Sequence, residues 1–280
     1  MKILARIFAF ILIVALMAGC GETAETREST GMTTQPTETA PVETTTAPIE
    51  TTEAPLPVTT QEGLEAALAK KLMVVLEGDI QLTTGVEVKD HHLMGEGYQI
   101  TAPVYDEENK ETYCGVFLTR GTLENVTVKG GYRAIGTSSE HRVTGDMRLT
   151  NVVAEGSNSA LYVGQGNQDG ILYVVDSEFY GRTIYNRRAS AYFENCTFGF
   201  NDEGSQGNIT AYVNTSLVGC RFEPMEGKKF SISFASSVDG MTMVLENCYV
   251  GDTLITAENI KTLLKVKANN NTISVFNTTG

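Results

Sequence analysis

The 280-residue sequence contains no tryptophan, only three histidines, and 21 basic against 34 acidic residues, which gives a net charge of −13. From residue 61 onward the charge is −9, from 18 basic and 27 acidic residues. A body this acidic repels nucleic-acid phosphates, so DNA and RNA are disfavoured as partners. The five cysteines include no C-x-x-C pair, which argues against a zinc site. No apolar run of 18 residues occurs after residue 20, so we expect no membrane span in the mature chain.

The amino terminus has the pattern of an export signal. Lys2 and Arg6 form a basic region, and Ile7–Met17 is an apolar stretch too short to cross a bilayer. It ends in Leu-Met-Ala-Gly-Cys at Cys20, which resembles the lipobox of bacterial lipoproteins, with Met17 in place of the usual leucine. The resemblance implies cleavage before Cys20 and lipidation of its sulfur, and hence an extracytoplasmic protein anchored to the outer face of the cell membrane. The alternative is an ordinary signal peptide with a chance cysteine.

After the signal peptide (1–20), a low-complexity segment covers residues 21–60. It contains 14 threonines, five prolines and seven glutamates among 40 residues. Such a segment cannot bury enough apolar surface to offset its ordering entropy, so we expect a disordered stalk or passive linker. Residues 61–280 are left as one folded domain.

A six-residue pattern recurs in this domain, with apolar residues at positions one, four and six. Its third positions are Asn125, Asn151, Asp176, Asn195, Gly219 and Asn247. They are 26, 25, 19, 24 and 28 residues apart, about 24 on average. Asn, Asp and Gly tolerate a left-handed backbone, so the pattern predicts a sharp corner between two strands at each of these residues.

Further strand-like segments lie between successive corners, such as Ile171–Val174 before one corner and Arg182–Tyr185 after it. Three short strands in each turn of about 24 residues predict a coil whose turns stack through parallel pairing. The pattern resembles the right-handed parallel β-helix of pectin-lyase-like proteins, most clearly over residues 123–250. That resemblance implies an all-β solenoid with a capping helix at its N-terminal end.

Both ends of the domain have candidate caps. Thr59 and Glu62 have capping-box spacing ahead of an amphipathic segment that runs from Leu64 to Leu72. At the other end, Ala257–Lys265 is expected to form a small helix before a last strand at Ile273–Phe276. Caps are expected because an open solenoid end exposes its core and its strand edges.

The cysteines and histidines allow a structural interpretation. Without Cys20, four cysteines remain: Cys114, Cys196, Cys220 and Cys248. The last three of these occupy the same column of successive repeats. Stacked turns would bring that column within disulfide range, but the parallel side-chain directions favour a ladder of buried free thiols. His91 and His92 in a predicted turn, and His141 in a polar loop, are expected on the surface.

Enzymes of the pectin-lyase-like fold cleave or modify acidic polysaccharides, but their signatures are missing here. The sequence has no Asp-Asp and no Gly-His-Gly, and its aspartates do not align on neighbouring turns. Carboxylates could still converge from different turns, and Glu155, Asp169 and Asp202 with Glu203 are the candidates. No cofactor is expected, and Ca²⁺ would be implied only for a lyase. We therefore expect a non-catalytic protein, with a polysaccharide lyase or glycoside hydrolase as the alternative.

The third strand of each turn has the best candidate binding surface. Tyr162, Tyr185 and Tyr212 are 23 and 27 residues apart, and alternation would place them outside if Leu161, Ile184 and Ala211 point inward. Exposed rings in a row could stack on sugars, although tryptophan, the commonest sugar-stacking residue, is absent. Nearby guanidinium groups suited to carboxylates come from Arg133, Arg182, Arg187 and Arg188.

The sequence therefore predicts a monomeric surface lipoprotein whose β-helix binds or scaffolds an extended polysaccharide or cell-wall glycan. A second alternative is a structural or adhesive surface protein that contacts other proteins. The first expectation depends on the predicted tyrosine row of Tyr162, Tyr185 and Tyr212.

Overall fold

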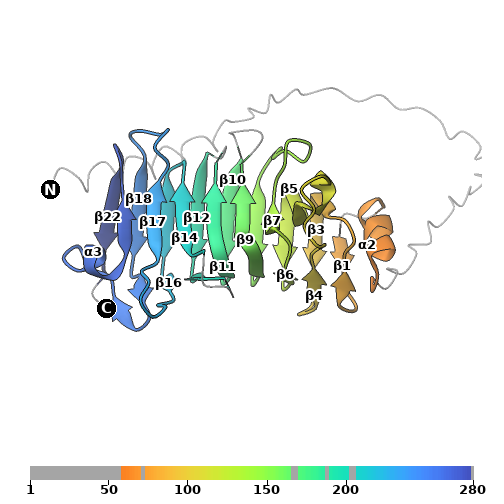
Figure 1. Cartoon of the computed structure of the whole chain (residues 1–280), viewed down its shortest axis with the longest axis horizontal. Helices are drawn as coiled ribbons and strands as arrows, with labels where there is room; N and C mark the ends of the chain where they lie inside the picture. Colours follow the sequence, from red (N-terminus) through yellow and green to blue (C-terminus); the bar gives the residue numbers. More distant parts are fainter. Residues whose placement is uncertain (1–57, 71–72, 165–169, 187–188, 202–205, 279–280) are drawn as a thin grey trace, which may run out of the picture. The chain divides into compact units, whose positions relative to one another are not determined.

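The computed structural model describes residues 58–70, 73–164, 170–186, 189–201 and 206–278. They form an all-β parallel solenoid of about 7 turns, with about 26 residues per turn (Figure 1). The predicted architecture is therefore confirmed. The turn is longer than the predicted 24 residues because some connections are long, notably 102–113 and 137–146. Cys20, Arg187 and Arg188 lie outside the described residues, as do the signal peptide and almost all of the stalk.

Each turn contributes strands to three faces, which we call A, B and C in chain order. Face A precedes the corner and contains β1 (Met73–Val75), the end of β3 (Val86–Met94), the end of β5 (Cys114–Glu124), β8 (Met147–Thr150), β10 (Ile171–Val175), β12 (Ser190–Glu194), β15 (Thr215–Val218), β18 (Thr242–Glu246) and β22 (Thr272–Phe276). Neighbouring strands in this face are parallel.

Face B follows the corner and contains β2 (Ile80–Gln81), β4 (Gln99–Thr101), β6 (Thr127–Lys129), the start of β9 (Val153–Val163), the start of β11 (Glu178–Tyr185), β13 (Thr197–Gly199), β16 (Arg221–Phe222) and β19 (Tyr249–Val250). Face C contains the starts of β3 and β5, β7 (Arg133–Gly136), the ends of β9 and β11, β14 (Asn208–Ala211), β17 (Ser231–Phe234) and β21 (Lys265–Lys267). Short extra elements are η1 (Lys110–Thr112) and β20 (Thr253–Leu254), which pairs antiparallel with β19.

The predicted corner residues have the expected backbone. All six have a positive φ, from 49° at Asp176 to 63° at Gly219. Side chains also connect successive corners: the Asn151 amide donates to the Asn125 Oδ1, and the Asn195 Nδ2 donates to the Asp176 Oδ1 at 3.1 Å. The corner ladder therefore has two stabilising parts, a residue type that tolerates the left-handed conformation and hydrogen bonds along the stack.

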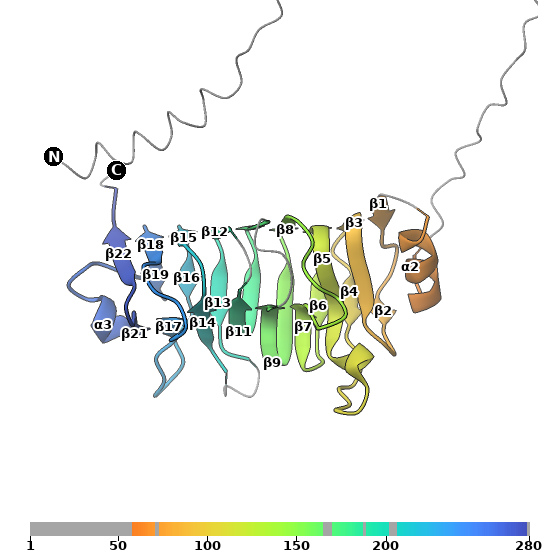
Figure 2. The same cartoon turned by 90° about the horizontal axis from the view of Figure 1, so that it is seen from above.

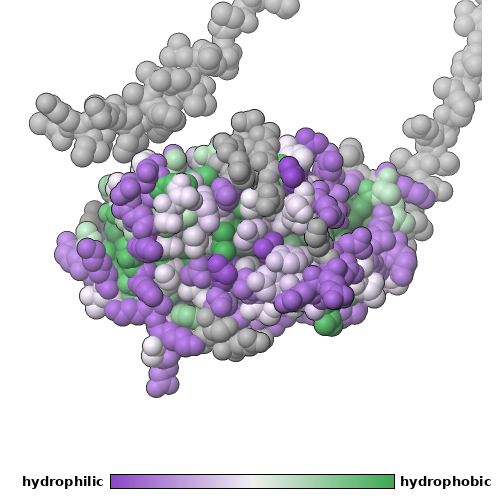
Figure 3. All heavy atoms as spheres, turned by 45° about the horizontal axis from the view of Figure 1, so that its top comes forward, coloured by the Kyte–Doolittle hydropathy of each residue, from purple (hydrophilic) through white to green (hydrophobic). Residues whose placement is uncertain are grey.

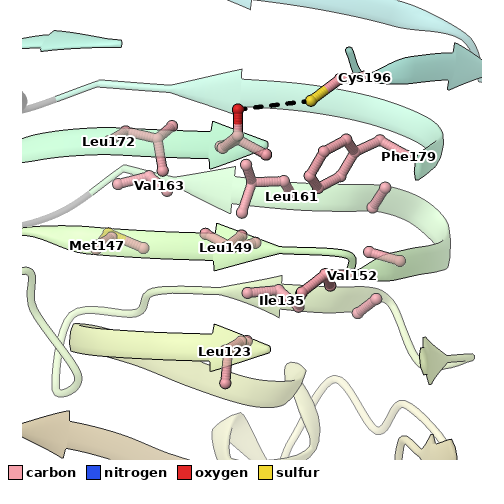
Figure 4. Close-up of a cluster of buried hydrophobic side chains, with 14 of the residues drawn as sticks. Leu123, Ile135, Met147, Leu149, Val152, Leu161, Val163, Leu172, Phe179 and Cys196 are labelled. Carbon is pink, nitrogen blue, oxygen red and sulfur yellow. Dashed lines mark hydrogen bonds between the residues drawn. The ribbon is translucent and has the colours of Figure 1, made fainter. Parts of the chain in front are cut away.

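The core lies inside the three faces and consists of like side chains stacked turn upon turn. Figure 4 shows leucine, isoleucine and valine side chains from successive turns pointing into one interior. In face B the rings of Phe179, Phe198 and Phe222 stack at centroid distances of 5.7 and 5.6 Å. The whole apolar interior, of which this ring stack is a part, is the main stabilising feature of the fold.

A helix lies at each end of the described solenoid (Figure 2). α2 (Gln61–Leu68) begins one residue later than the Thr59 box predicted, because the N-cap is Thr60, whose Oγ1 accepts from the Gly63 amide at 3.1 Å. Leu64, Ala67 and Leu68 of α2 are buried. At the C-terminal end α3 (Ile260–Leu263) precedes β21 and β22, in agreement with the predicted short helix and last strand.

Candidate functional site

The predicted row of exposed tyrosines on face C does not exist. Tyr185 is fully buried and pairs with Val163 and Ala211, whereas Tyr162 pairs with Ile184. The cause is an irregularity in β9, where the pairing with β11 shifts by one residue after Ser159. Because side chains alternate along a strand, a shift of one residue exchanges inside for outside. The predicted outward orientation of Tyr185 is therefore wrong.

The other predicted residues of face C lie in different surroundings. The Arg133 Cζ lies 3.5 Å from the Tyr162 ring centroid and 4.4 Å from that of Tyr113, in a cation–π cluster that Tyr105 and Tyr132 extend. The Arg133 Nη1 also donates to the Thr137 carbonyl at 3.1 Å. Arg133 thus covers a face of Tyr162 that a sugar would need. Tyr212 is half-buried in the connection after β14.

An exposed aromatic pair is found instead on face A. The outward positions of consecutive strands are Thr122, Arg148, Tyr173, Tyr192 and Ser216, each paired with the next. The Tyr173 and Tyr192 rings are 5.5 Å apart with an interplanar angle of 33°, and their side chains are 40% and 42% exposed. The Arg148 Cζ lies 5.6 Å from the Tyr173 centroid. We call Arg148, Tyr173 and Tyr192 the face A platform.

A hollow lies at each end of this platform. Arg148 lines the first, of about 470 Å³, together with Arg120 and Asp146. Tyr192 lines the second, of about 170 Å³, together with Asn214 and Ser216. The platform and the two hollows therefore form one continuous strip across the strands, with a hydrogen-bonding rim and an aromatic centre.

Charged groups near the first hollow are held in place by their neighbours. Arg120 forms an ion pair with Asp90, and its hydrogen bond holds the pKa of that carboxyl below its usual value. The Asp146 carboxylate accepts from the Ile171 amide at 2.9 Å. His92 Nε2 lies 2.6 Å from the Glu124 Oε2. These contacts leave the first hollow lined by oriented charges.

The strand pattern contained the signal for the face A platform. Tyr173 lies between the buried residues Leu172 and Val174, and Tyr192 lies between Ala191 and Phe193. Alternation alone therefore predicts both rings outside. What the pattern could not supply is the register that puts them side by side with Arg148.

Face B carries the candidate carboxylates. Glu155 is almost fully buried and pairs with the Lys129 ammonium at 3.0 Å, beside a hollow of about 380 Å³. The Tyr180 hydroxyl donates to the Glu178 Oε2 at 2.8 Å. Burial is the main cause that raises the pKa of Tyr180, and the hydrogen bond to Glu178 raises it further. Within the described ranges no group of three His, Cys, Asp or Glu residues could hold a metal ion. Asp169, Asp202 and Glu203 lie outside those ranges.

The cysteines form the predicted ladder of buried free thiols. The Cys196, Cys220 and Cys248 thiols each donate to the carbonyl two residues earlier, at 3.3, 3.5 and 3.5 Å. Burial raises the pKa of Cys114 to about 12. Of the histidines, His141 stacks on the Phe117 ring at 4.2 Å and is only partly exposed.

In the part that the structure describes, no helix is both long and apolar enough to cross a membrane. No family model, curated protein or solved structure matches this sequence.

Proposed function

We propose that this protein is a surface lipoprotein whose face A binds an extended polysaccharide without cleaving it. The observation that carries the proposal is the exposed, adjacent pair of Tyr173 and Tyr192 beside Arg148. Two adjacent, partly exposed ring faces are costly to hydrate, and sugar rings with apolar faces and polar edges suit them.

The direction of the face A platform favours an extended ligand. Neighbouring strands of a sheet are about 4.8 Å apart, so each turn of the solenoid adds one contact at a regular interval. A glycan that lies across the strands would meet the first hollow, then Arg148 and the two rings, and then the second hollow. Arg148 would favour a ligand with carboxylate or phosphate groups.

Attachment to the membrane is the second part of the proposal. Lipidation of Cys20 would place the solenoid outside the cytoplasm, and the threonine-rich segment that precedes Val58 would act as a spacer. Replacing Cys20 with Ala should move the protein from the membrane fraction to the soluble fraction. Equal membrane retention of the variant would contradict a lipid anchor.

The binding test uses the double variant Tyr173→Ala/Tyr192→Ala and a panel of neutral and acidic polysaccharides in affinity electrophoresis. Two lost ring contacts of about 1 kcal/mol each predict that affinity falls about tenfold or more. Tyr98→Ala is the matched control, because that ring is 38% exposed but belongs to no platform. No binding by the wild-type protein, or equal loss in both variants, would overturn the proposal.

A polysaccharide lyase or glycoside hydrolase is the second candidate, and the contact that favours it is Tyr180 with Glu178 on face B. A carboxylate and a tyrosine hydroxyl are suitable groups for proton transfer. This candidate predicts unsaturated uronate absorbance or new reducing ends from acidic glycans, and their loss in Glu178→Gln. The third candidate, a structural or adhesive protein, predicts no glycan binding at all.

A further inference from the structure

A lysine-lined hollow of about 710 Å³ lies at the C-terminal end of face C. Its charged rim comes from three separate parts of the chain: Lys228 and Lys229 before β17, Lys261 in α3, and Lys265 at the start of β21. Figure 2 shows α3, β17 and β21 together at this end of the solenoid. We call this site the lysine hollow. It is on a different face from the face A platform.

The concentration of positive charge is unusual for this chain. The protein carries a net charge of −13, yet four of its eleven lysines line this one hollow. In the part of the chain that the structure describes, Lys229, Lys261 and Lys265 form no ion pair. Like charges that share a hollow repel one another, and a bound anion would relieve that repulsion.

Polar groups continue from the lysine hollow along face C. Lys265 pairs with Ser231, Ser231 with Asn208, and Asn208 with Arg182, so these outward positions form one row of cations, hydroxyl and amide. The Asn208 Nδ2 donates to the Thr210 Oγ1 at 3.0 Å, which orients its side chain. No carboxylate occurs among these four positions.

The chemistry of the lining favours phosphate over a carboxylate. Lysine is a compact point charge without the planar fork of arginine, and the lysine hollow contains no arginine. A phosphate group carries a charge near −1.5 to −2 and accepts hydrogen bonds in several directions, so several ammonium groups can surround it. A carboxylate carries less charge and suits a bidentate arginine better.

The lysine hollow leaves room for a ligand larger than a phosphate group. About 710 Å³ is far more than one phosphate requires, and it lies in the range of small-molecule sites. Phe200, Leu264 and Val266 supply apolar wall, while Gln206, Asn208 and Ser231 supply hydrogen-bonding groups. We propose that the lysine hollow binds a phosphate ester of a sugar or polyol, with the phosphate among the lysines and the hydroxyl-bearing part against this mixed wall.

The experiment is calorimetric titration of the full chain with four probes: glycerol 3-phosphate, glucose 6-phosphate, inorganic phosphate and glucose. The variant is Lys261→Gln/Lys265→Gln, and its charge-matched control is Lys70→Gln/Lys89→Gln on exposed residues far along the chain. We expect millimolar or tighter binding of an ester, weakened about tenfold or more in the variant and unchanged in the control. Glucose alone should not bind.

Three results would overturn the inference. One is the absence of ester binding by the wild-type protein, and another is an equal loss in variant and control, which would indicate an effect of net charge. The third is inorganic phosphate binding as tightly as both esters, which would refute the role of the mixed wall. The platform variant Tyr173→Ala/Tyr192→Ala should bind the esters normally, so this site and the face A proposal fail independently. If one ester binds and the other does not, the result supports the site and shows whether it prefers the polyol or the sugar that bears the phosphate.

Discussion

The corner ladder permits a sharp test of the relation between residue type and fold, with Asn195→Val as the perturbation. Asn195 has a φ of 53° and donates to the Asp176 carboxylate at 3.1 Å. A β-branched residue in the left-handed region costs about 1–3 kcal/mol, and the lost hydrogen bond adds about 0.5–1.5 kcal/mol. We therefore expect the free energy of unfolding to fall by about 2–4 kcal/mol.

The assay is urea unfolding followed by circular dichroism, with two further variants that separate the causes. Asn195→Gly removes the hydrogen bond but keeps a residue that readily adopts the left-handed backbone, so its free energy of unfolding should fall by only about 1 kcal/mol. Thr242→Val introduces the same valine at an exposed strand position and should change little. An unchanged midpoint in Asn195→Val would refute the reasoning, and an equal loss in Asn195→Gly would assign the effect to the hydrogen bond instead of the backbone.

Three further variants test the interior. Phe198→Ala should reduce stability by about 3–5 kcal/mol in urea, because that ring is fully buried in the phenylalanine stack. Tyr185→Phe should cost about 1 kcal/mol by removing the acceptor of the Thr215 hydroxyl, and it should leave glycan binding unchanged. Burial raises the pKa of Cys114 from 9.0 to about 12, so the folded state keeps a proton that the unfolded chain loses. That contribution to stability is full below pH 9 and is lost between pH 9 and about 12. The urea midpoint of Cys114→Ala should therefore fall less than that of the wild-type protein as the pH rises through this range.

The parts of the fold that were predictable are those that depend on local chemistry. A left-handed corner needs a particular kind of residue at one position, so Asn125 and its equivalents identify the turns directly. The thiol ladder follows from the same register, because Cys196 comes directly after the corner residue Asn195. The length of a turn was less well predicted, since loops such as 102–113 add residues without changing the stacked strands.

The candidate sites depended on register, which the sequence encodes only indirectly. The one-residue shift in the β9–β11 pairing after Ser159 sets the buried Tyr185 opposite Val163, although its spacing from Tyr162 suggested an aligned pair. The lysine hollow was harder still, because Lys229 and Lys265 are 36 residues apart and meet only where α3 and β21 return to face C. No short motif could have identified that meeting.

The division of chemistry among the three faces follows from how a solenoid is built. Its interior is filled by residues that every turn must supply, which leaves the outward positions of each strand free to vary without cost to the core. The side of the molecule seen in Figure 3 is mainly hydrophilic, with separate hydrophobic areas. Because outward residues of adjacent turns lie about 4.8 Å apart, any chemistry repeated in two or three turns becomes a strip. The adjacent rings of face A are one such strip. The outward row of face C is a mixed polar strip with a cation at each end, Lys265 and Arg182. Both would suit ligands with extended polar groups.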